Sequence, residues 1–292
     1  YNVVVGDEAG TAITTGDYHT TVGYAAGASV TTATNNTVIG ALAGDALTEG
    51  NYNVVVGVNA LTADTKGSYT TALGHGALAA QNFTSATDSY NTAVGHAAGA
   101  AVTTGVNNTL IGGLAGDAIT TSSGNVAVGY ASLTSATTAD LNTAIGFGTL
   151  TTNILSDRNV ALGYESLSQH NLASNGDGYN TALGFNAGRL VTTGGANTLV
   201  GGLAGDAQTT AANSTAVGYA ALGATTTGSN NTAIGKEALD ANTTGSENVG
   251  VGVGALGANT TAANNVAVGV NALLANTTGT AGTALGKSAL AA

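Results

Sequence analysis

A glycine preceded by an aliphatic residue recurs along the whole chain, and 14 of the 16 intervals between these glycines are equal, each as long as the step from Gly6 to Gly23. The two exceptions, residues 75–95 and 164–184, are longer by four positions. An uninterrupted period of this kind is typical of a solenoid, in which each coil covers the hydrophobic face of its neighbour. We therefore predict one β-solenoid repeat domain over residues 1–292, with about 17 coils of 17 residues. Coil positions are counted from these anchor glycines: Gly6, Gly23, Gly40, Gly57, Gly74, Gly95, Gly112, Gly129, Gly146, Gly163, Gly184, Gly201, Gly218, Gly235, Gly252, Gly269 and Gly286.

A short β-strand is predicted immediately before each anchor glycine. Position −1 is Val, Ile or Leu in all 17 coils, and position −3 is Thr or Val. This period-2 alternation of β-branched residues favours a strand, and nothing recurs at the helical period of 3.6. We expect Ile234 and its equivalents at −1 to form the inward face of an all-β, parallel β-roll.

The anchor glycines and position +4 predict how the interior is packed. An anchor glycine such as Gly23, Gly40, Gly57 or Gly235 suits a positive φ or a close approach of the next coil. Position +4 is Leu in ten coils, as at Leu239, and Gly in seven. Six of the seven Gly coils carry an aliphatic residue at +7, so we expect Leu at +4 and an aliphatic at +7 to fill the same core space. The seventh carries Gln208, which the pattern does not explain.

Position −4 is Asn in 13 of the 17 coils, as at Asn231. Identical amides stacked at the coil repeat form hydrogen-bonded ladders. We therefore expect an Asn ladder along the coils, with a structural role.

Composition restricts the classes of partner and chemistry. The chain has 16 acidic and five basic residues, which disfavours nucleic acid and anionic membranes as partners. It has no cysteine, and no apolar run approaches the length of a membrane span, so we expect no disulfide, thiolate metal site or membrane-spanning segment. We find no nucleophile–base pair, phosphate-binding loop or catalytic carboxylate pair, and expect neither an enzyme nor a cofactor.

Association between copies is predicted from the small core. Each coil offers only two or three aliphatic side chains to its interior, against an ordering cost of about 1–2 kcal/mol per residue. We therefore expect a homotrimer in which strands from three chains meet in a shared core. Both ends of the sequence fall inside repeats, so we also expect a segment of a longer fibre or a subunit that stacks end to end.

The coils resemble the left-handed parallel β-roll heads of trimeric autotransporter adhesins. The motif is an Asn-x-Ala-aliphatic-Gly strand, found at Asn125–Gly129, Asn231–Gly235 and Asn265–Gly269. Those heads use a shorter coil. The longer unit, with Asn-Thr-Thr-Gly in its turn, is similar to repeats of bacteriophage tail fibres. The resemblance implies a trimeric fibre that reaches for a host surface.

The two long coils supply the candidate receptor contacts, since each adds four positions to an outer turn. The candidates are Gln81, Asn82, Phe83, Gln169, His170 and Leu172. A tolerated insertion without a binding role is the alternative.

Other residues have weaker functional interpretations. Six coils carry an aromatic residue at +1: Tyr24, Tyr130, Phe147, Tyr164, Phe185 and Tyr219. These rings suit stacking on sugars, and the alternative is that they cover the seam between coils or chains. His75 and His96 share that position in neighbouring coils but lack a recurring third metal ligand. Asp45, Asp117 and Asp206 lack the Gly-Gly-x-Gly-x-Asp series of calcium-binding rolls.

The leading hypothesis is a structural fibre shaft of an adhesive appendage, such as a phage tail fibre, on a virion surface or outside a cell. Its expected partners are copies of itself and a host-surface glycan or protein. A bacterial trimeric autotransporter-type adhesin is the second hypothesis. An ice-binding solenoid and a glycan-degrading spike are further alternatives.

Overall fold

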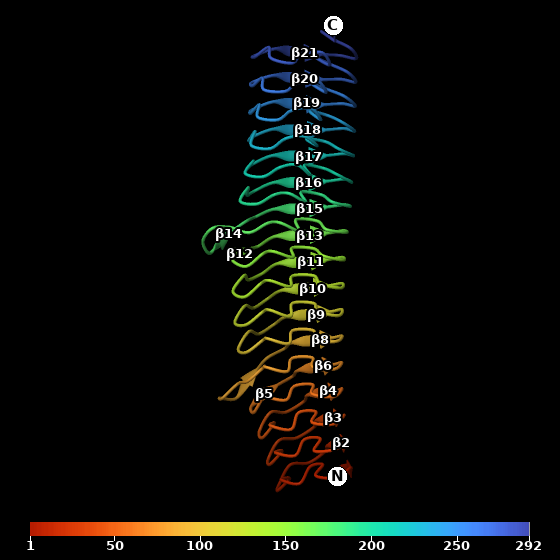
Figure 1. The fold of residues 1–292 in the computed structure, drawn as a ribbon, viewed down its shortest axis with the longest axis vertical. Helices are drawn as coiled ribbons and strands as arrows, with labels where there is room; N and C mark the ends of the chain where they lie inside the picture. The colour runs from red at the N-terminus through yellow and green to blue at the C-terminus, as the bar shows by residue number, and fades with distance from the viewer. Residues whose placement is uncertain (292) are drawn as a thin grey trace. The chain divides into compact units, whose positions relative to one another are not determined.

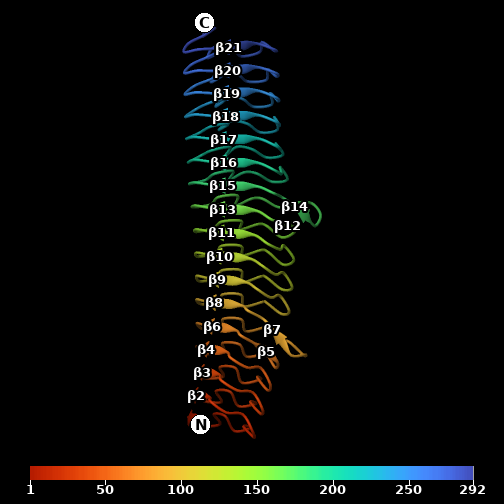
Figure 2. The same ribbon diagram turned by 180° about the vertical axis from the view of Figure 1, so that it is seen from behind.

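The computed structural model describes residues 1–291 and divides into two compact units, residues 1–142 and residues 143–292. Each unit is a parallel β-solenoid in which every coil contributes one three-residue strand to a sheet (Figures 1 and 2). No helix occurs in the described residues. The predicted all-β parallel solenoid of about 17 coils is confirmed. The single domain over residues 1–292 stays a prediction.

In the first unit, strands on successive coils pair in parallel and in register. Val3 pairs with Thr20 and Thr20 with Thr37, so that equivalent positions of successive coils are neighbours. The long coil keeps this register, with Thr71 beside Thr92. The strands are β1 (Val3–Val5), β2 (Thr20–Val22), β3 (Thr37–Ile39), β4 (Val54–Val56), β6 (Thr71–Leu73), β8 (Thr92–Val94), β9 (Thr109–Ile111) and β10 (Val126–Val128).

The second unit repeats this arrangement. Its long coil also preserves the register, with Val160 beside Thr181. The strands are β11 (Thr143–Ile145), β13 (Val160–Leu162), β15 (Thr181–Leu183), β16 (Thr198–Val200), β17 (Thr215–Val217), β18 (Thr232–Ile234), β19 (Val249–Val251), β20 (Val266–Val268) and β21 (Thr283–Leu285).

The strands face the opposite way from the sequence prediction. In β18 the middle residue, Ala233, is fully buried, whereas Ile234 is 41% exposed. The same pattern of a buried middle residue and exposed or half-buried flanks runs through β2 and every later three-residue strand. The expected inward orientation of Ile234 and its equivalents is therefore wrong. They lie on the outer surface, and each chain closes a core of its own.

Leu at +4 and aliphatic residues at +7 fill the interior, as predicted. Leu239 and most of its equivalents are fully buried, and so are Leu47 and Ile119 in the Gly coils. Position −2 shares this space. It is Ala or Gly in nine of the ten Leu coils, but Val, Thr or Leu in five of the seven Gly coils. A Cβ added at Gly44, which occupies +4, would lie 3.5 Å from the Val38 side chain at −2 of the same coil, and one added at Gly250 would lie 3.4 Å from Leu239 of the preceding coil, so a large residue at one position favours a small one at the other.

Gln208 occupies the aliphatic place at +7 with its side chain fully buried and neither amide atom hydrogen-bonded. A buried polar group without a partner costs about 1–3 kcal/mol. We expect Gln208→Leu to raise the free energy of unfolding by about that amount, measured by urea denaturation. The matched control is Gln81→Leu, which should destabilise, because the Gln81 amide contacts Asp64 and Asn91 at 2.7 and 2.8 Å. Equal effects of the two changes would contradict this account.

The anchor glycines combine both predicted features. Gly235 has a φ of 134°, and a Cβ there would lie 2.6 Å from the backbone carbonyl of Gly252. Gly23, Gly40 and Gly57 have φ values of 134°, 131° and 140° and meet the next anchor glycine as closely. The glycines therefore set how near successive coils can lie.

Two side-chain ladders connect successive coils. The predicted Asn ladder is present: Asn53 N–H donates to Asn36 Oδ1 at 2.8 Å, while Asn36 Nδ2 donates to the carbonyl of Gly50 in its own coil at 2.8 Å. His19 replaces Asn in this role, with Nε2 2.7 Å from the Ala33 carbonyl. A Thr ladder at +8 was not predicted. Thr243 Oγ1, for example, donates to the carbonyl of Thr260 at 3.0 Å.

Candidate functional site

The two long coils form loops that project from the solenoid (Figures 1 and 2). In the first unit, β5 (Gly67–Ser68) pairs in parallel with β7 (Thr87–Asp88). In the second unit, β12 (Ser156–Asp157) pairs in the same way with β14 (Gly176–Asp177). Each loop is thus a small two-stranded sheet that involves the long coil and the coil before it.

Three of the six predicted receptor contacts lie in the interior. Gln81 and His170 are fully buried and Phe83 is 5% exposed, so these side chains are not on the surface. This corrects their assignment as receptor contacts. Gln169 is exposed, and Asn82 and Leu172 are half-buried, so only these three stay surface candidates.

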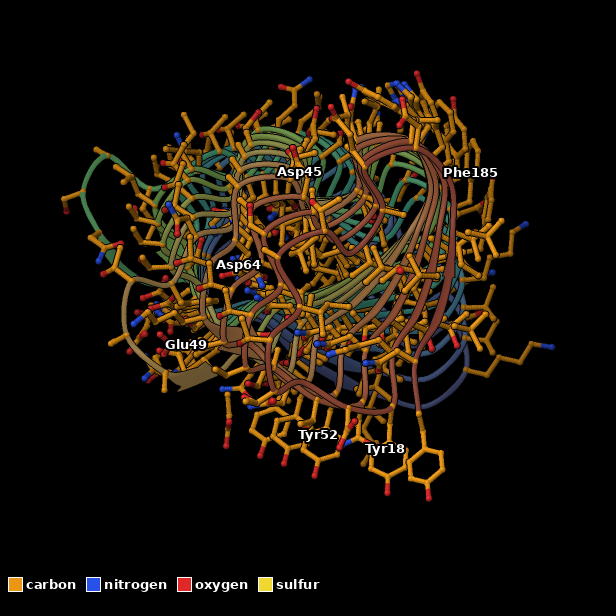
Figure 3. The ribbon with its side chains drawn as sticks, turned by 90° about the horizontal axis from the view of Figure 1, so that it is seen from below. Tyr18, Asp45, Glu49, Tyr52, Asp64 and Phe185 are labelled. Carbon is orange, nitrogen blue, oxygen red and sulfur yellow. The ribbon has the colours of Figure 1, made fainter. Side chains whose placement is uncertain are left out.

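A buried polar network supports the first loop. Asp64 lies inside the coil (Figure 3), where Oδ1 accepts hydrogen bonds from the backbone N–H groups of Gly67 and Phe83 at 3.0 and 3.1 Å. Gln81 Nε2 donates to Asp64 Oδ2 at 2.7 Å, and Asn91 Nδ2 donates to Gln81 Oε1 at 2.8 Å. Gln81 and Asp64 therefore have a structural role in holding the loop.

The second loop has Asn153 and His170 at the places of Asp64 and Gln81. His170 Nε2 lies 2.8 Å from Ser156 Oγ, while His170 Nδ1 has no partner. The sequence did not indicate this Ser–His pair. Both side chains are fully buried, so no substrate reaches them. Burial lowers the pKa of His170 from 6.5 to about 4, which keeps the ring neutral near pH 7.

Acid should loosen the second loop through His170. Between pH 6.5 and 4 the unfolded chain binds a proton that the folded chain does not, so stability falls as the pH is lowered through this window, by up to about 3 kcal/mol. We expect His170→Gln, which installs the residue of the first loop, to remove this component. The check is amide hydrogen exchange in residues 167–180 of both chains at pH 7 and pH 4.5. The same acid-induced loss of protection in both would contradict the assignment.

Aromatic side chains form stacked rows on the surface. Phe147, Tyr164 and Phe185, which were candidates at +1, stack with ring centroids 5.3 and 5.4 Å apart. A second row, at −5, was missed, although its spacing is visible in the sequence: Tyr52, Tyr69 and Tyr90, with centroids 5.1 and 5.4 Å apart. Because stacked rings cover each other's faces, the middle ring of each row offers its edge rather than its face to a ligand.

Tyr18 occupies the same position in an earlier coil, and together with Tyr52 it shows the direction of the tyrosine row. Tyr18 and Tyr52 both project away from the coil on the same side (Figure 3). They are 57% and 50% exposed. The tyrosine row lies next to the strands, because position −5 directly precedes the −4 position of the Asn ladder.

The structure places the histidine candidates in one stacked pair and the aspartate candidates in separate coils. His75 and His96 stack, with ring centroids 5.4 Å apart. Burial raises the pKa of the Asp45, Asp117 and Asp206 carboxyl groups, which lie in separate coils. Across residues 1–291, no three His, Cys, Asp or Glu side chains are grouped to hold a metal ion.

The outer face of the strands is a further candidate surface. We define the strand face as positions −3 and −1 of all coils, which are Thr or Val and Val, Ile or Leu, respectively. Neither position carries a charge in any coil. Leu73, Leu162 and Leu183 are each 42% exposed, so large aliphatic side chains meet solvent along both units.

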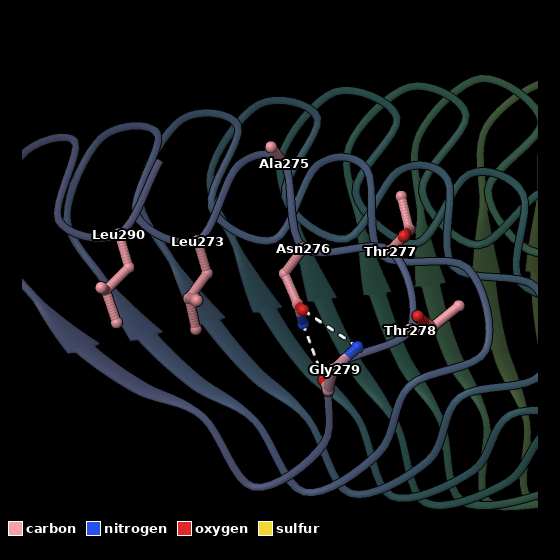
Figure 4. A pocket seen from close by; sticks show the side chains of 7 residues that line it. All are labelled: Leu273, Ala275, Asn276, Thr277, Thr278, Gly279 and Leu290. Atoms are coloured by element: carbon pink, nitrogen blue, oxygen red, sulfur yellow. Dashed lines mark hydrogen bonds between the residues drawn. The ribbon is translucent and has the colours of Figure 1, made fainter. Parts of the chain in front are cut away.

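A cavity of about 360 Å³ lies beside the last coils of the second unit, lined by Leu273, Ala275, Asn276, Thr277, Thr278, Gly279 and Leu290 (Figure 4). Asn276 Nδ2 donates to the Gly279 carbonyl at 2.8 Å, and Gly279 N–H donates to Asn276 Oδ1 at 3.0 Å. In an earlier coil, Asn153 makes the same pair of bonds with Ser156. The cavity therefore contains structural groups of the coil interior, and these amides are already paired.

Comparison with known proteins gives no family assignment: no family model matches the chain, and no curated protein matches its sequence. In the part of the chain that the structure describes, no helix is long and apolar enough to span a membrane.

Proposed function

We propose that this chain is a structural shaft segment of an adhesive appendage, most simply a phage tail fibre, built by parallel association of three copies. The observation that carries the proposal is the uncharged strand face. Every coil leaves a Val, Ile or Leu at −1 on the outside, and a soluble monomer rarely exposes a contiguous apolar surface of this extent.

A second copy of the same chain is the partner that fits this face. The aliphatic side chains of the second copy recur at the same coil spacing as those of the first. The two sets can therefore pack between each other along the strand face of each unit. In the first unit, eight rungs about 4.8 Å apart and about 13 Å wide give roughly 500 Å² per copy. With the second unit the face measures about 1,000 Å² per copy, so three copies that share it bury about 3,000 Å² in total, which is enough for a stable assembly.

The ladders support a mechanical role. Asn and Thr hydrogen bonds connect successive coils in each unit, in addition to the backbone bonds between strands. Loading along the coils therefore strains many parallel bonds rather than one. The bacterial adhesin remains the second candidate, since it shares this architecture.

Immunoelectron microscopy tests the assignment. Fab fragments raised against the chain should label fibres on virions, and should block attachment of those virions to their host cells. Labelling of bacterial cell-surface fibres would favour the adhesin instead. Labelling confined to the cell interior would refute both.

A further inference from the structure

A cavity of about 460 Å³ interrupts the outer surface of the second unit. It is lined by Glu237, Asp240, Ala241, Val253, Gly254, Gly257, Ala258, Asn271 and Leu274. Its origin is one unusual coil, because only the coil after Gly252 has glycine at both +2 and +5, namely Gly254 and Gly257. The missing side chains leave a hollow between the larger residues of the coils on either side.

The walls offer polar groups that the protein does not satisfy. Among the described residues, no donor contacts the Asp240 carboxylate, which is half-buried. At the same coil position, Asp45 and Asp117 each also leave a buried carboxylate oxygen, Oδ1, without a hydrogen-bond partner. Glu237 on the same wall pairs with Lys236 at 3.2 Å. Asp240 thus faces the cavity as a partly desolvated acceptor, and burial followed by the Glu237 charge raises its pKa.

The opposite wall combines an amide with an apolar surface. A Cβ at Gly254 would lie 2.6 Å from Asn271 Oδ1, and a Cβ at Gly257 would lie 3.1 Å from Leu274 Cδ1. These two side chains therefore lean over the glycine floor. The Asn271 amide has no hydrogen-bond partner among the described residues, so it is free to donate and to accept.

We propose that this cavity binds one neutral hexose unit of a glycan. The hydroxyl groups of a hexose supply the donors that Asp240 lacks, and the Asn271 amide both donates to and accepts from a hydroxyl. One C–H face of the sugar ring packs against Leu274. The volume lies within the range of small-molecule sites. Two carboxylates on one wall repel acidic sugars.

The site leaves the strand face available. Its glycine floor and acidic wall lie at +2 and +5, whereas self-association uses −3 and −1. The biological role of the site rests on the proposed adhesive function, but the binding of free sugar is measured without it.

Saturation-transfer NMR with the purified chain tests the proposal. The probes are the methyl glycosides of glucose, galactose and mannose, with glucuronate and glucosamine for comparison. We expect millimolar binding of at least one neutral glycoside and none of glucuronate. Gly257→Thr fills the cavity and should weaken binding at least tenfold, as should Asp240→Asn. Thr62 and Thr151 show that a coil accommodates Thr at +5.

The matched control is Ala100→Thr, the same position in a coil of the first unit, which should leave binding unchanged. No binding of any neutral glycoside, or unchanged binding in both cavity variants, would overturn the site. Binding of glucosamine alone would also overturn it, since that identifies an ammonium site. If virion attachment is blocked by Fab fragments but no sugar binds, the proposed function stands and this site fails. If a neutral glycoside binds but Fab fragments do not block virion attachment, this site stands and the proposed function fails.

Discussion

Gly235→Ala is expected to lower the free energy of unfolding by at least about 4 kcal/mol, one of the largest effects of a single methyl group. A φ of 134° is a region that residues with a Cβ rarely adopt, which costs about 1–3 kcal/mol. The added Cβ also meets the carbonyl carbon and oxygen of Gly252 at 2.6 Å. Because these are backbone atoms, relief requires the two coils to separate.

Hydrogen exchange locates this effect. Protection should be lost first in β18 and β19, because these two strands pair with each other and end at Gly235 and Gly252, where the added Cβ forces the coils apart. The control is Gly76→Ala, since Gly76 has a φ of 66° and a Cβ there meets no atom within 4 Å. Other coils carry Ala at this position, as at Ala25 and Ala97. If Gly235→Ala is as stable as Gly76→Ala, the close approach of coils does not limit the fold.

Charging the strand face is expected to convert the assembly into monomers. The variant Val217→Asp, Ile234→Asp, Val251→Asp places three carboxylates on neighbouring rungs of the face. Burying unpaired charges in an apolar interface costs several kcal/mol each. Sedimentation equilibrium should give about three times 27.8 kDa for the natural chain and 27.8 kDa for the variant.

The control for that experiment introduces the same three carboxylates on a different side of the coil. Thr227→Asp, Thr244→Asp, Thr261→Asp alters exposed +9 residues of the same coils, and should remain trimeric. Both variants should keep the circular dichroism of the natural chain, because the altered side chains point out of the core. A natural chain that sediments as a monomer would refute the association, and a dimer would refute its stoichiometry.

The repeat itself was predictable from the sequence because register in a parallel solenoid equals sequence period. Strands of successive coils pair Val3 with Thr20 only if each coil returns to the same place, and the spacing of the glycines records that return. The Asn ladder followed for the same reason. Identical side chains at a fixed spacing become neighbours whatever the shape of the coil.

The direction of the strand face was not predictable from hydrophobicity alone. Period-2 alternation separates a strand into two faces but does not say which face is inside. The larger aliphatic set, represented by Ile234, was placed inside, yet the interior admits only Ala233. The signal that was missed is the exchange of volume between −2 and +4, which shows that these two positions share one space.

The candidate sites were also predictable only in part. The sequence located both long coils, but not that Gln81 and His170 turn inward to support them. The period makes Asp64 and Gln81 neighbours, and it brings Ser156 and His170 into successive coils, but it does not show that these polar side chains point into the core. The cavity beside Asp240 depends on two glycines in one coil and on the side chains of its neighbours, which a list of motifs does not combine.

The sequence by itself determined the coil, its period, the places that require glycine and the residues that stack, because each of these depends on the chain's return to the same position once in every coil. Only the tertiary structure decided which strand residues face the core and which polar groups are already paired. Those outcomes depend on the width of the closed coil, because the side chains at −2, +4 and +7 already fill its interior and leave no space for the larger aliphatic residues at −1.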